Sequence, residues 1–328
     1  TPSALSPEQS PEQSRDGSSG PSAEQERAQE PAPTAHGAQD AAPAAATTTT
    51  GTGGSGADTP DGEVRTEDEL RARLGLGPRS WTMPRAVRIR GWVVTGVVGV
   101  IAALLRLIGL GHPKTLMFDE IYYVKDAYAL WHLGYEANWA ANSDVAFASG
   151  NFSGMSQEAA YVVHPQLGKW IIGAGMEVFG PSSSFGWRIM PAVAGILTVM
   201  LLTRLTMRLT RSPLLAGLAG LLLAVDGVAL TESRIGLLDV FIGFFATVSL
   251  YCLVRDREWS RARLARRMAG TRPGARAPHA TIRPWLLATG IALGLTCSIK
   301  WSGLYLVAVV GVAVVAWDTL APVSYTHL

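Results

Sequence analysis

GWVVTGVVGVIAALLRLIGL, residues 91–110, contains a single charged side chain in twenty positions. About 20 predominantly apolar residues are needed for a helix to cross the roughly 30 Å hydrocarbon core of a bilayer. Similar apolar stretches recur along the chain, so the sequence predicts an all-α, multi-spanning membrane protein with about six transmembrane helices. The other expected helices lie at 185–207, 213–230, 235–254, 284–300 and 301–320.

The first 80 residues differ in composition from the rest. The chain of 328 residues is 48% hydrophobic and 16% charged, yet 1–80 has almost no large apolar side chains and includes the tracts SPEQSPEQS and TTTTGTGGSG. Such a segment buries too little apolar surface to offset its ordering entropy, which predicts a disordered tail at 1–80 and a membrane domain at 81–328. We expect the tail not to be a signal peptide, because it has no apolar core segment. The start at Thr1 and the end at APVSYTHL, after an incomplete helix pattern, indicate a fragment whose last residues need not be native.

The arginines predict how the helices are oriented, because cytoplasmic loops collect Lys and Arg. The segment 255–283 carries nine arginines and two acidic residues, whereas 111–184 has no arginine, three lysines and seven acidic residues. We therefore expect a cytoplasmic N-terminus, a basic cytoplasmic loop at 255–283 and a long loop at 111–184 outside the cell membrane. The net charge of +2 does not indicate a nucleic-acid partner, and no basic and aromatic interleaving suggests one.

Two adjacent carboxylates follow the first apolar stretch. Asp119 and Glu120 stand in KTLMFDEIYYVKDAYALW, residues 114–131, among tyrosines and a tryptophan that are typical of membrane interfaces. A carboxylate just below the lipid headgroups can act as a general base on a hydroxyl acceptor. The alternative is that the two acids only solvate the start of a loop.

A second motif in the same loop is VVHPQLGKWIIGAGMEVFG, residues 162–180. Pro165 suits a first helical turn, and the helix that follows is too short to span, so we expect it in or against the membrane interface. His164 and Lys169 would then lie near the headgroups, although an ordinary amphipathic loop helix explains His164 equally well. The apolar stripe predicted for this helix comprises Leu167, Ile171, Ala174 and Val178.

Two basic residues stand at outer helix ends. Arg188 lies a few residues inside the second apolar stretch, in FGWRIMP, and Lys300 lies in CSIKWSG. An arginine inside a membrane is costly and usually has a partner, and its planar fork matches phosphate oxygens. Both residues are candidate ligands of an anionic lipid phosphate; the alternative is that each side chain extends to the interface as an ordinary helix flank.

A third cluster surrounds the short outer turn in LLLAVDGVALTESRIGLLDVF, residues 221–241. Glu232 and Arg234 can close this turn by pairing. Asp226 and Asp239 fall within apolar stretches, and buried acids of this kind indicate a polar cavity. With the preceding motifs, these residues suggest a catalytic cavity at the outer membrane surface.

In the motifs FDEIYYVKDA, HPQLGKW, FGWRIMPA, LLLAVDGVALTESRIGLLDVF and SIKWSGLY, the sequence resembles the protein O-mannosyltransferase family, glycosyltransferases of the GT-C class, and most of all its actinobacterial branch. The resemblance extends from about residue 81 to 320. The sequence departs from the family pattern at Gln166, where the family usually has a second proline.

The resemblance implies transfer of mannose from polyprenyl-phosphate mannose to Ser or Thr of exported proteins, with inversion at the anomeric carbon. It implies that Asp119 is the general base, that Glu120 orders the acceptor site, that Arg188 and Lys300 hold the lipid phosphate, and that His164 lines the site. Lys169, Glu232, Arg234 and Asp239 are further site-lining candidates. We expect no cofactor and no metal, because the donor brings its own leaving group and no metal-ligand spacing is visible. The family's chain normally continues with further helices, so this fragment alone is not expected to be active.

Two alternatives remain from the sequence. A related GT-C enzyme could move another sugar, such as an aminoarabinose, from polyprenyl phosphate to a lipid. A transporter or flippase could use the intramembrane charges as a path, but transporters commonly have repeated halves with charges at mid-depth, whereas these charges gather at one face.

Overall fold

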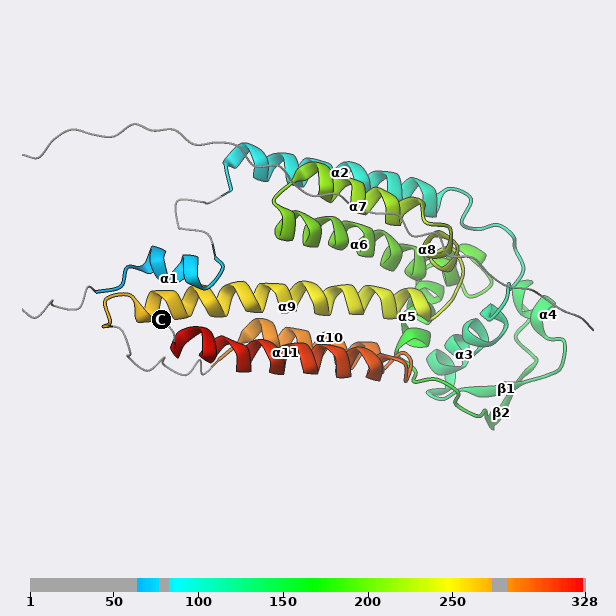
Figure 1. Ribbon diagram of the computed structural model, residues 1–328. Helices are drawn as coiled ribbons and strands as arrows, with labels where there is room; N and C mark the ends of the chain where they lie inside the picture. The colour runs from blue at the N-terminus through cyan, green and yellow to red at the C-terminus, as the bar shows by residue number, and fades with distance from the viewer. Residues whose placement is uncertain (1–63, 77–82, 273–281, 327–328) are drawn as a thin grey trace, which may run out of the picture. The chain divides into compact units, whose positions relative to one another are not determined.

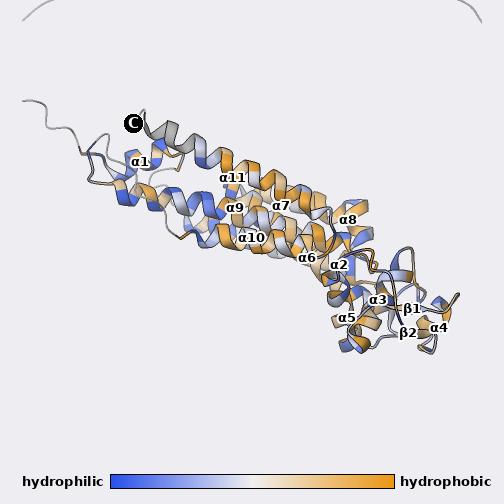
Figure 2. Ribbon diagram, turned by 90° about the horizontal axis from the view of Figure 1, so that it is seen from below, coloured by the Kyte–Doolittle hydropathy of each residue, from blue (hydrophilic) through white to orange (hydrophobic). Residues whose placement is uncertain are grey.

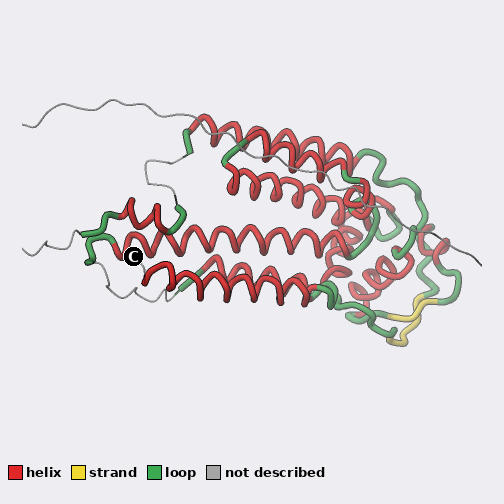
Figure 3. Tube along the Cα trace, in the orientation of Figure 1, coloured by secondary structure: helices red, strands yellow, loops and turns green. Residues whose placement is uncertain are grey.

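The computed structural model describes residues 64–76, 83–272 and 282–326, and within them the chain is mostly helical (Figures 1 and 3). Long helices run side by side. They are α2 (Arg85–Leu107), α6 (Ser184–Thr210), α7 (Pro213–Val225), α9 (Asp239–Met268), α10 (Pro284–Cys297) and α11 (Gly303–Thr326). All six predicted apolar segments therefore form helices. Among the described residues, α2 and α6 are long and apolar enough to cross a membrane, and α7, α10 and residues 303–319 are shorter apolar helices.

The segment between α2 and α6 forms a small subdomain at one end of the helices, which we call the loop end (Figure 1). It contains α3 (Glu120–Leu133), α4 (Asp144–Ala148), α5 (Leu167–Phe179) and the antiparallel pair β1 (Ala137–Trp139) and β2 (Met155–Ala159). The short helix α8 (Gly227–Glu232) lies at the same end, between α7 and α9. The opposite end, which we call the arginine end, carries α1 (Glu67–Arg73) and the polar half of α9 (Figure 2).

The largest buried cluster fastens this subdomain to the helices. Tyr123 and Val124 of α3, Ile172 of α5 and Trp187 of α6 pack with Phe241 of α9. The subdomain has an aromatic core in which the ring of Tyr128 stacks on Phe152 at 4.4 Å between centroids and meets Phe147 edge-on at 5.7 Å. Burial of these large rings stabilises this end.

Helix α5 begins after Pro165 as predicted, and its most buried face lies beside the predicted apolar stripe. The structure buries Gly168, Ile172 and Met176 rather than the stripe that includes Val178, whose exposed fraction is 73%. Small residues allow α5 to approach its neighbours closely: a Cβ at Gly175 would lie 2.5 Å from the carbonyl oxygen of Gly186 in α6. Of the predicted stripe, Leu167 and Ile171 are partly buried against the main core cluster, whereas Val178 is exposed.

Three features of the helices and their ends differ from the prediction. Residues 64–76, assigned to the disordered tail, include α1, whose Leu70 and Leu74 pack on Ala265 and Met268 of α9. The basic loop predicted at 255–283 is helical as far as Met268, because α9 runs on for 30 residues. Asp226 is an exposed residue that ends α7 and accepts the backbone N–H of Ala229 at 2.8 Å, so it caps α8 and is not the buried acid that was predicted.

Candidate functional site

Glu120, the first residue of α3, is the most completely bound carboxylate at the loop end. Its side chain is fully buried, and its oxygens accept hydrogen bonds from Nε and Nη2 of Arg188 at 2.8 and 2.7 Å. The backbone N–H groups of Met117 and Gly236 add hydrogen bonds of 2.8 and 2.7 Å. Both oxygens thus accept two hydrogen bonds each, and this carboxylate joins α3, α6 and the turn before α9.

Arg188 is equally enclosed. Its side chain is 1% exposed, and Nη1 and Nη2 donate to the carbonyl oxygens of Pro113 and Thr115 at 2.7 and 2.9 Å. The two-pronged contact with Glu120 uses the planar fork that suits arginine to carboxylates. The guanidinium of Arg188 thus binds a carboxylate within the protein. The expected role of Arg188 as a phosphate ligand stays a prediction.

Asp119, the neighbour of Glu120, has a different environment. It precedes the first turn of α3, it is half-buried, and among the described residues its carboxylate forms no ion pair. The residue before it, Phe118, has a left-handed backbone with φ +51° and a side chain that is 74% exposed. A bulky residue in that region is strained, and such strain is often found at functional sites. The turn therefore presents Asp119 at the surface while Glu120 is held inside.

Tyr123 and His164 lie close to Asp119. Burial raises the pKa of the Tyr123 phenol, and the nearby charges of Asp119 and Asp239 and a hydrogen bond to Asp119 raise it further. The ring of His164 lies 6.1 Å from that of Tyr123. Burial, followed by the charges of Lys300 and Lys169, lowers the pKa of His164, so its imidazole is neutral near pH 7.

Lys300 and Asp239 form an ion pair beside this group. The Lys300 ammonium lies 2.9 and 2.7 Å from the two carboxylate oxygens of Asp239, whose side chain is 42% exposed. Asp239 begins α9, and Lys300 stands in the turn between α10 and α11. Asp239 was predicted to be a buried acid, but its side chain is partly exposed and is paired with Lys300.

Lys169 has a structural environment that the sequence did not indicate. Its ammonium is 1% exposed and lies 2.9 Å from Asp126 and 2.7 Å from Glu136. Burial raises the pKa of both carboxyl groups, while the charge of Lys169 opposes that shift. Asp126 and Glu136 were not singled out from the sequence, because their partner is more than 30 positions away. This triad joins α3, α5 and the start of β1.

Arg234 caps the C-terminal end of α2 and does not pair across the turn. It donates to the carbonyl oxygens of Leu105, Arg106 and Ile108 at 2.5, 3.2 and 2.9 Å, where α2 has no more internal donors. The pairing with Glu232 that the sequence left open as an alternative is not formed, and the site-lining role of both residues stays a prediction. Burial, followed by the charge of Asp239, raises the pKa of Glu232. The buried Arg106, which the sequence analysis did not single out, binds the carbonyl oxygen of Ala224 near the end of α7 at 3.1 Å.

Around Asp119 the loop end thus combines a half-buried carboxylate, a neutral imidazole, a phenol and a lysine paired with a half-open acid. These groups can accept a proton from a hydroxyl and place a cation near an anionic leaving group. Among the described residues, no three His, Cys, Asp or Glu side chains are grouped so that they could hold a metal ion.

Residues 96–324 match the family model for dolichyl-phosphate-mannose-protein mannosyltransferases. The chain belongs to this mannosyltransferase family. It is 37% identical over 248 residues to the polyprenol-phosphate-mannose–protein mannosyltransferase of Mycolicibacterium smegmatis, covering 73% of this chain and 44% of that protein. The protein of the same name from Mycobacterium tuberculosis is 35% identical, over 73% of this chain and 43% of the relative. The chain thus spans less than half the length of these relatives of the mannosyltransferase family.

A solved structure supports the fold. The Saccharomyces cerevisiae protein O-mannosyltransferase Pmt1–Pmt2 complex, bound to the sugar donor, resembles this chain with a TM-score of 0.53 and 21% identity. The similarity covers 83% of this chain and 34% of the yeast chain. The mannosyltransferase family predicted from the motifs and the mostly helical fold are therefore confirmed, whereas the roles of individual site residues stay predictions.

Proposed function

We propose that the full-length protein transfers mannose from polyprenyl-phosphate mannose to Ser or Thr hydroxyls of exported proteins, with inversion. The observation that carries this proposal is the contrast between two adjacent acids in a chain of the mannosyltransferase family. Glu120 is fully buried and paired with Arg188, whereas Asp119 is half-buried and forms no ion pair with any described residue. One acid can therefore position the other, which is left to react.

In the proposed reaction, Asp119 is the general base. The acceptor hydroxyl gives its proton to the Asp119 carboxylate while its oxygen forms a bond to the anomeric carbon of mannose. The bond from that carbon to the phosphate oxygen breaks, and the phosphate leaves with the electron pair. An inverting displacement of this kind needs the base and the leaving group on opposite faces of the sugar.

The other residues have supporting roles. We assign the departing phosphate to Lys300, because its ammonium pairs with the half-open Asp239 and its charge acts on His164 more strongly than that of Lys169. His164 and Tyr123 line the sugar or acceptor side, and Glu232 lies at the edge of the same site. Arg188 is a positioning residue in this proposal, because its N–H groups already hold Glu120 and two carbonyl oxygens.

Labelled polyprenyl-phosphate mannose, membranes with the full-length protein and a Thr-rich peptide test this function. We expect label in the peptide, on its hydroxyl side chains, and none in membranes that lack the protein. Label recovered in a lipid product instead of the peptide would contradict the proposal and favour a GT-C enzyme that acts on lipids.

The proposal includes six membrane-crossing helices, with the loop end outside the cell membrane and the N-terminus in the cytoplasm. We expect an impermeant thiol reagent added to intact cells to label Tyr161→Cys but not Arg266→Cys, in a background with Cys252→Ala and Cys297→Ala. Both positions are exposed, and Tyr161 is 89% exposed, so access depends on the side of the membrane. Labelling of both in permeabilised cells is the control, and labelling of Arg266→Cys in intact cells would overturn this topology.

A further inference from the structure

A cavity of about 660 Å³ lies at the arginine end, at the opposite end of the helices from the candidate site. Its walls come from α1 and the residues after it, the last turns of α6 and the middle of α9. Its volume falls within the range of about 300–1,000 Å³ that is usual for small-molecule sites. The lining includes seven arginines, Arg71, Arg204, Arg208, Arg211, Arg255, Arg257 and Arg261.

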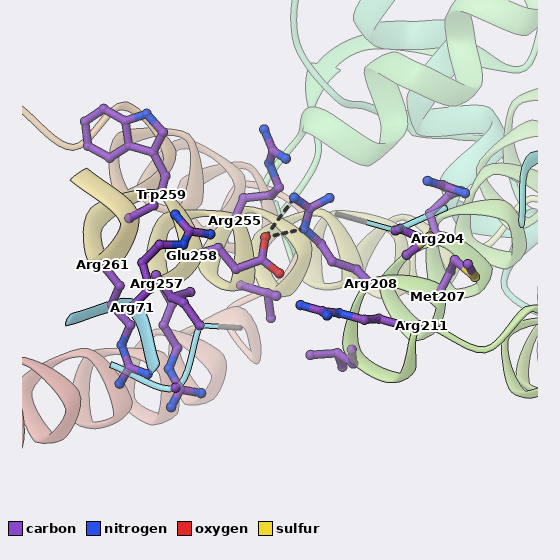
Figure 4. A pocket seen from close by; sticks show the side chains of 16 residues that line it. Arg71, Arg204, Met207, Arg208, Arg211, Arg255, Arg257, Glu258, Trp259 and Arg261 are labelled. Atoms are coloured by element: carbon purple, nitrogen blue, oxygen red, sulfur yellow. Dashed lines mark hydrogen bonds and ion pairs between the residues drawn. The ribbon is translucent and has the colours of Figure 1, made fainter. Parts of the chain in front are cut away.

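The cavity lining is strongly positive. Among the described residues, Glu258 is the one acidic residue that lines it, so the described lining carries seven positive charges and one negative charge. Figure 4 shows Glu258 joined to Arg208, the pair being 2.7 Å apart, with Arg204 and Arg211 on one side and Arg257 on the other. Arg71 has a further partner outside the lining, Glu67 at 3.8 Å, but two carboxylates do not balance seven arginines, so the cavity is a region of positive potential.

Tryptophan rings hold three of these arginines without neutralising them. The guanidinium carbon of Arg204 lies 3.9 Å from the ring centre of Trp92, that of Arg255 lies 4.4 Å from Trp285, and that of Arg257 lies 4.9 Å from Trp317. A cation–π contact fixes the position of a guanidinium while its charge stays available to a ligand. The arginines are thus ordered in advance, which lowers the cost of binding an anion.

Two buried donors in this lining have no partner. Nη1 of Arg204 and Nε of Arg255 have no hydrogen-bond acceptor among the described residues. An unsatisfied buried donor is costly, and native proteins rarely leave one without a reason. These two guanidinium groups therefore keep hydrogen-bonding capacity that no described residue uses.

Another arginine at the same end, Arg283, is neutralised by carboxylates. Arg283 forms ion pairs with Asp256 of α9 and Asp318 of α11, and thus has two carboxylates to itself. Placing a loop in the cytoplasm requires only exposed basic residues, and Arg266 and Arg267 at the end of α9 are of that kind. The convergence of seven arginines on one cavity therefore calls for a further explanation.

We propose that this cavity binds an anion with two phosphate groups, separately from the transfer site. Planar guanidinium groups bind phosphate oxygens in pairs, which suits a ligand with several such oxygens. The phosphates can belong to the headgroup of a diphosphatidylglycerol lipid or to a soluble diphosphate. Basic pockets between helices bind headgroups of this type, and here the cavity lies where the apolar part of α6 ends.

The double variant Arg211→Gln with Arg257→Gln tests the proposal in the full-length protein. Both residues line the cavity, and neither forms an ion pair with a described residue, so their removal leaves no described carboxylate unpaired. The matched control is Arg266→Gln with Arg267→Gln, which removes the same charge outside the lining. The probes are diphosphatidylglycerol in phosphatidylcholine nanodiscs, measured as retained lipid by native mass spectrometry, and inorganic diphosphate, measured by calorimetry in neutral nanodiscs.

We expect at least one probe to bind the wild-type protein and the control variant equally, and to bind the cavity variant about tenfold or more weakly, because charge-assisted hydrogen bonds are lost. Weakened binding of the lipid alone identifies a headgroup site, and weakened binding of diphosphate alone identifies a soluble ligand. Equal binding of both probes to the three proteins, or equal loss in the cavity and control variants, would overturn the proposal. Should the double variant fail to insert, Arg211→Gln alone gives the same comparison with Arg266→Gln.

Discussion

Glu120→Gln is expected to lower the stability of the full-length protein by about 3–5 kcal/mol, which is the cost of removing one partner of a buried ion pair. Arg188 is 1% exposed and would keep its charge with no carboxylate to balance it. The glutamine also brings an NH₂ group to a place where two arginine N–H groups and two backbone N–H groups all need acceptors. The midpoint of thermal unfolding in detergent, and the amount of monodisperse protein recovered, measure this loss.

Glu158→Gln provides the control for this change. Glu158 lies in β2 at an exposed position, so the same substitution there removes a charge without breaking a buried pair. It should leave the unfolding midpoint nearly unchanged. A Glu120→Gln protein as stable as the Glu158→Gln protein would show that the pair with Arg188 does not hold α3 in place.

Asp119→Asn is expected to lower the rate of mannose transfer by about 10²- to 10⁴-fold, the usual contribution of a general base. Asparagine has the size of aspartate and keeps most of its hydrogen bonding, but it cannot accept the hydroxyl proton. The half-buried carboxylate has no ion pair with a described residue, so folding should be little affected. Turnover with labelled donor and a Thr-rich peptide, divided by the amount of folded protein, measures the effect.

A control at the same end of the molecule is Asp226→Asn. Asp226 caps α8 by accepting the N–H of Ala229, and asparagine caps helices as well as aspartate does. This variant should keep wild-type turnover. If Asp119→Asn keeps more than about a third of wild-type turnover, Asp119 is not the general base.

The positions of the long helices could be predicted from apolar runs, because burial in lipid or in a helix bundle demands such runs along the chain. Helix ends were less predictable. The run at 235–254 did not indicate that α9 would start only at Asp239 and continue to Met268, since its polar half is stabilised by contact with α1. The sequence did contain a signal for the start of α1. Thr66 and Glu69 stand three positions apart, which is the spacing of a capping box, and they form one in the structure.

The candidate site was predicted as a group of residues but not as a set of contacts. Adjacent acids in an aromatic setting drew attention to Asp119 and Glu120, and the structure then separates them by burial. The partner of Glu120 is 68 positions away, and sequence spacing carries no information on such a pair. The same reason explains why Lys169 was assigned to the site, although it is enclosed by two acids that were not considered.

We propose that the two adjacent acids have different roles: Glu120 holds the turn in place, and Asp119 reacts. Single-turnover transfer from labelled polyprenyl-phosphate mannose to a Thr-rich peptide tests it, with Asp119→Asn and Glu120→Gln compared at equal amounts of folded full-length protein. We expect Asp119→Asn to lose about 10²-fold or more in rate at a wild-type unfolding midpoint, and Glu120→Gln to lose mainly stability and far less rate per folded molecule. A Glu120→Gln protein of wild-type stability that is as slow as Asp119→Asn would contradict these separate roles.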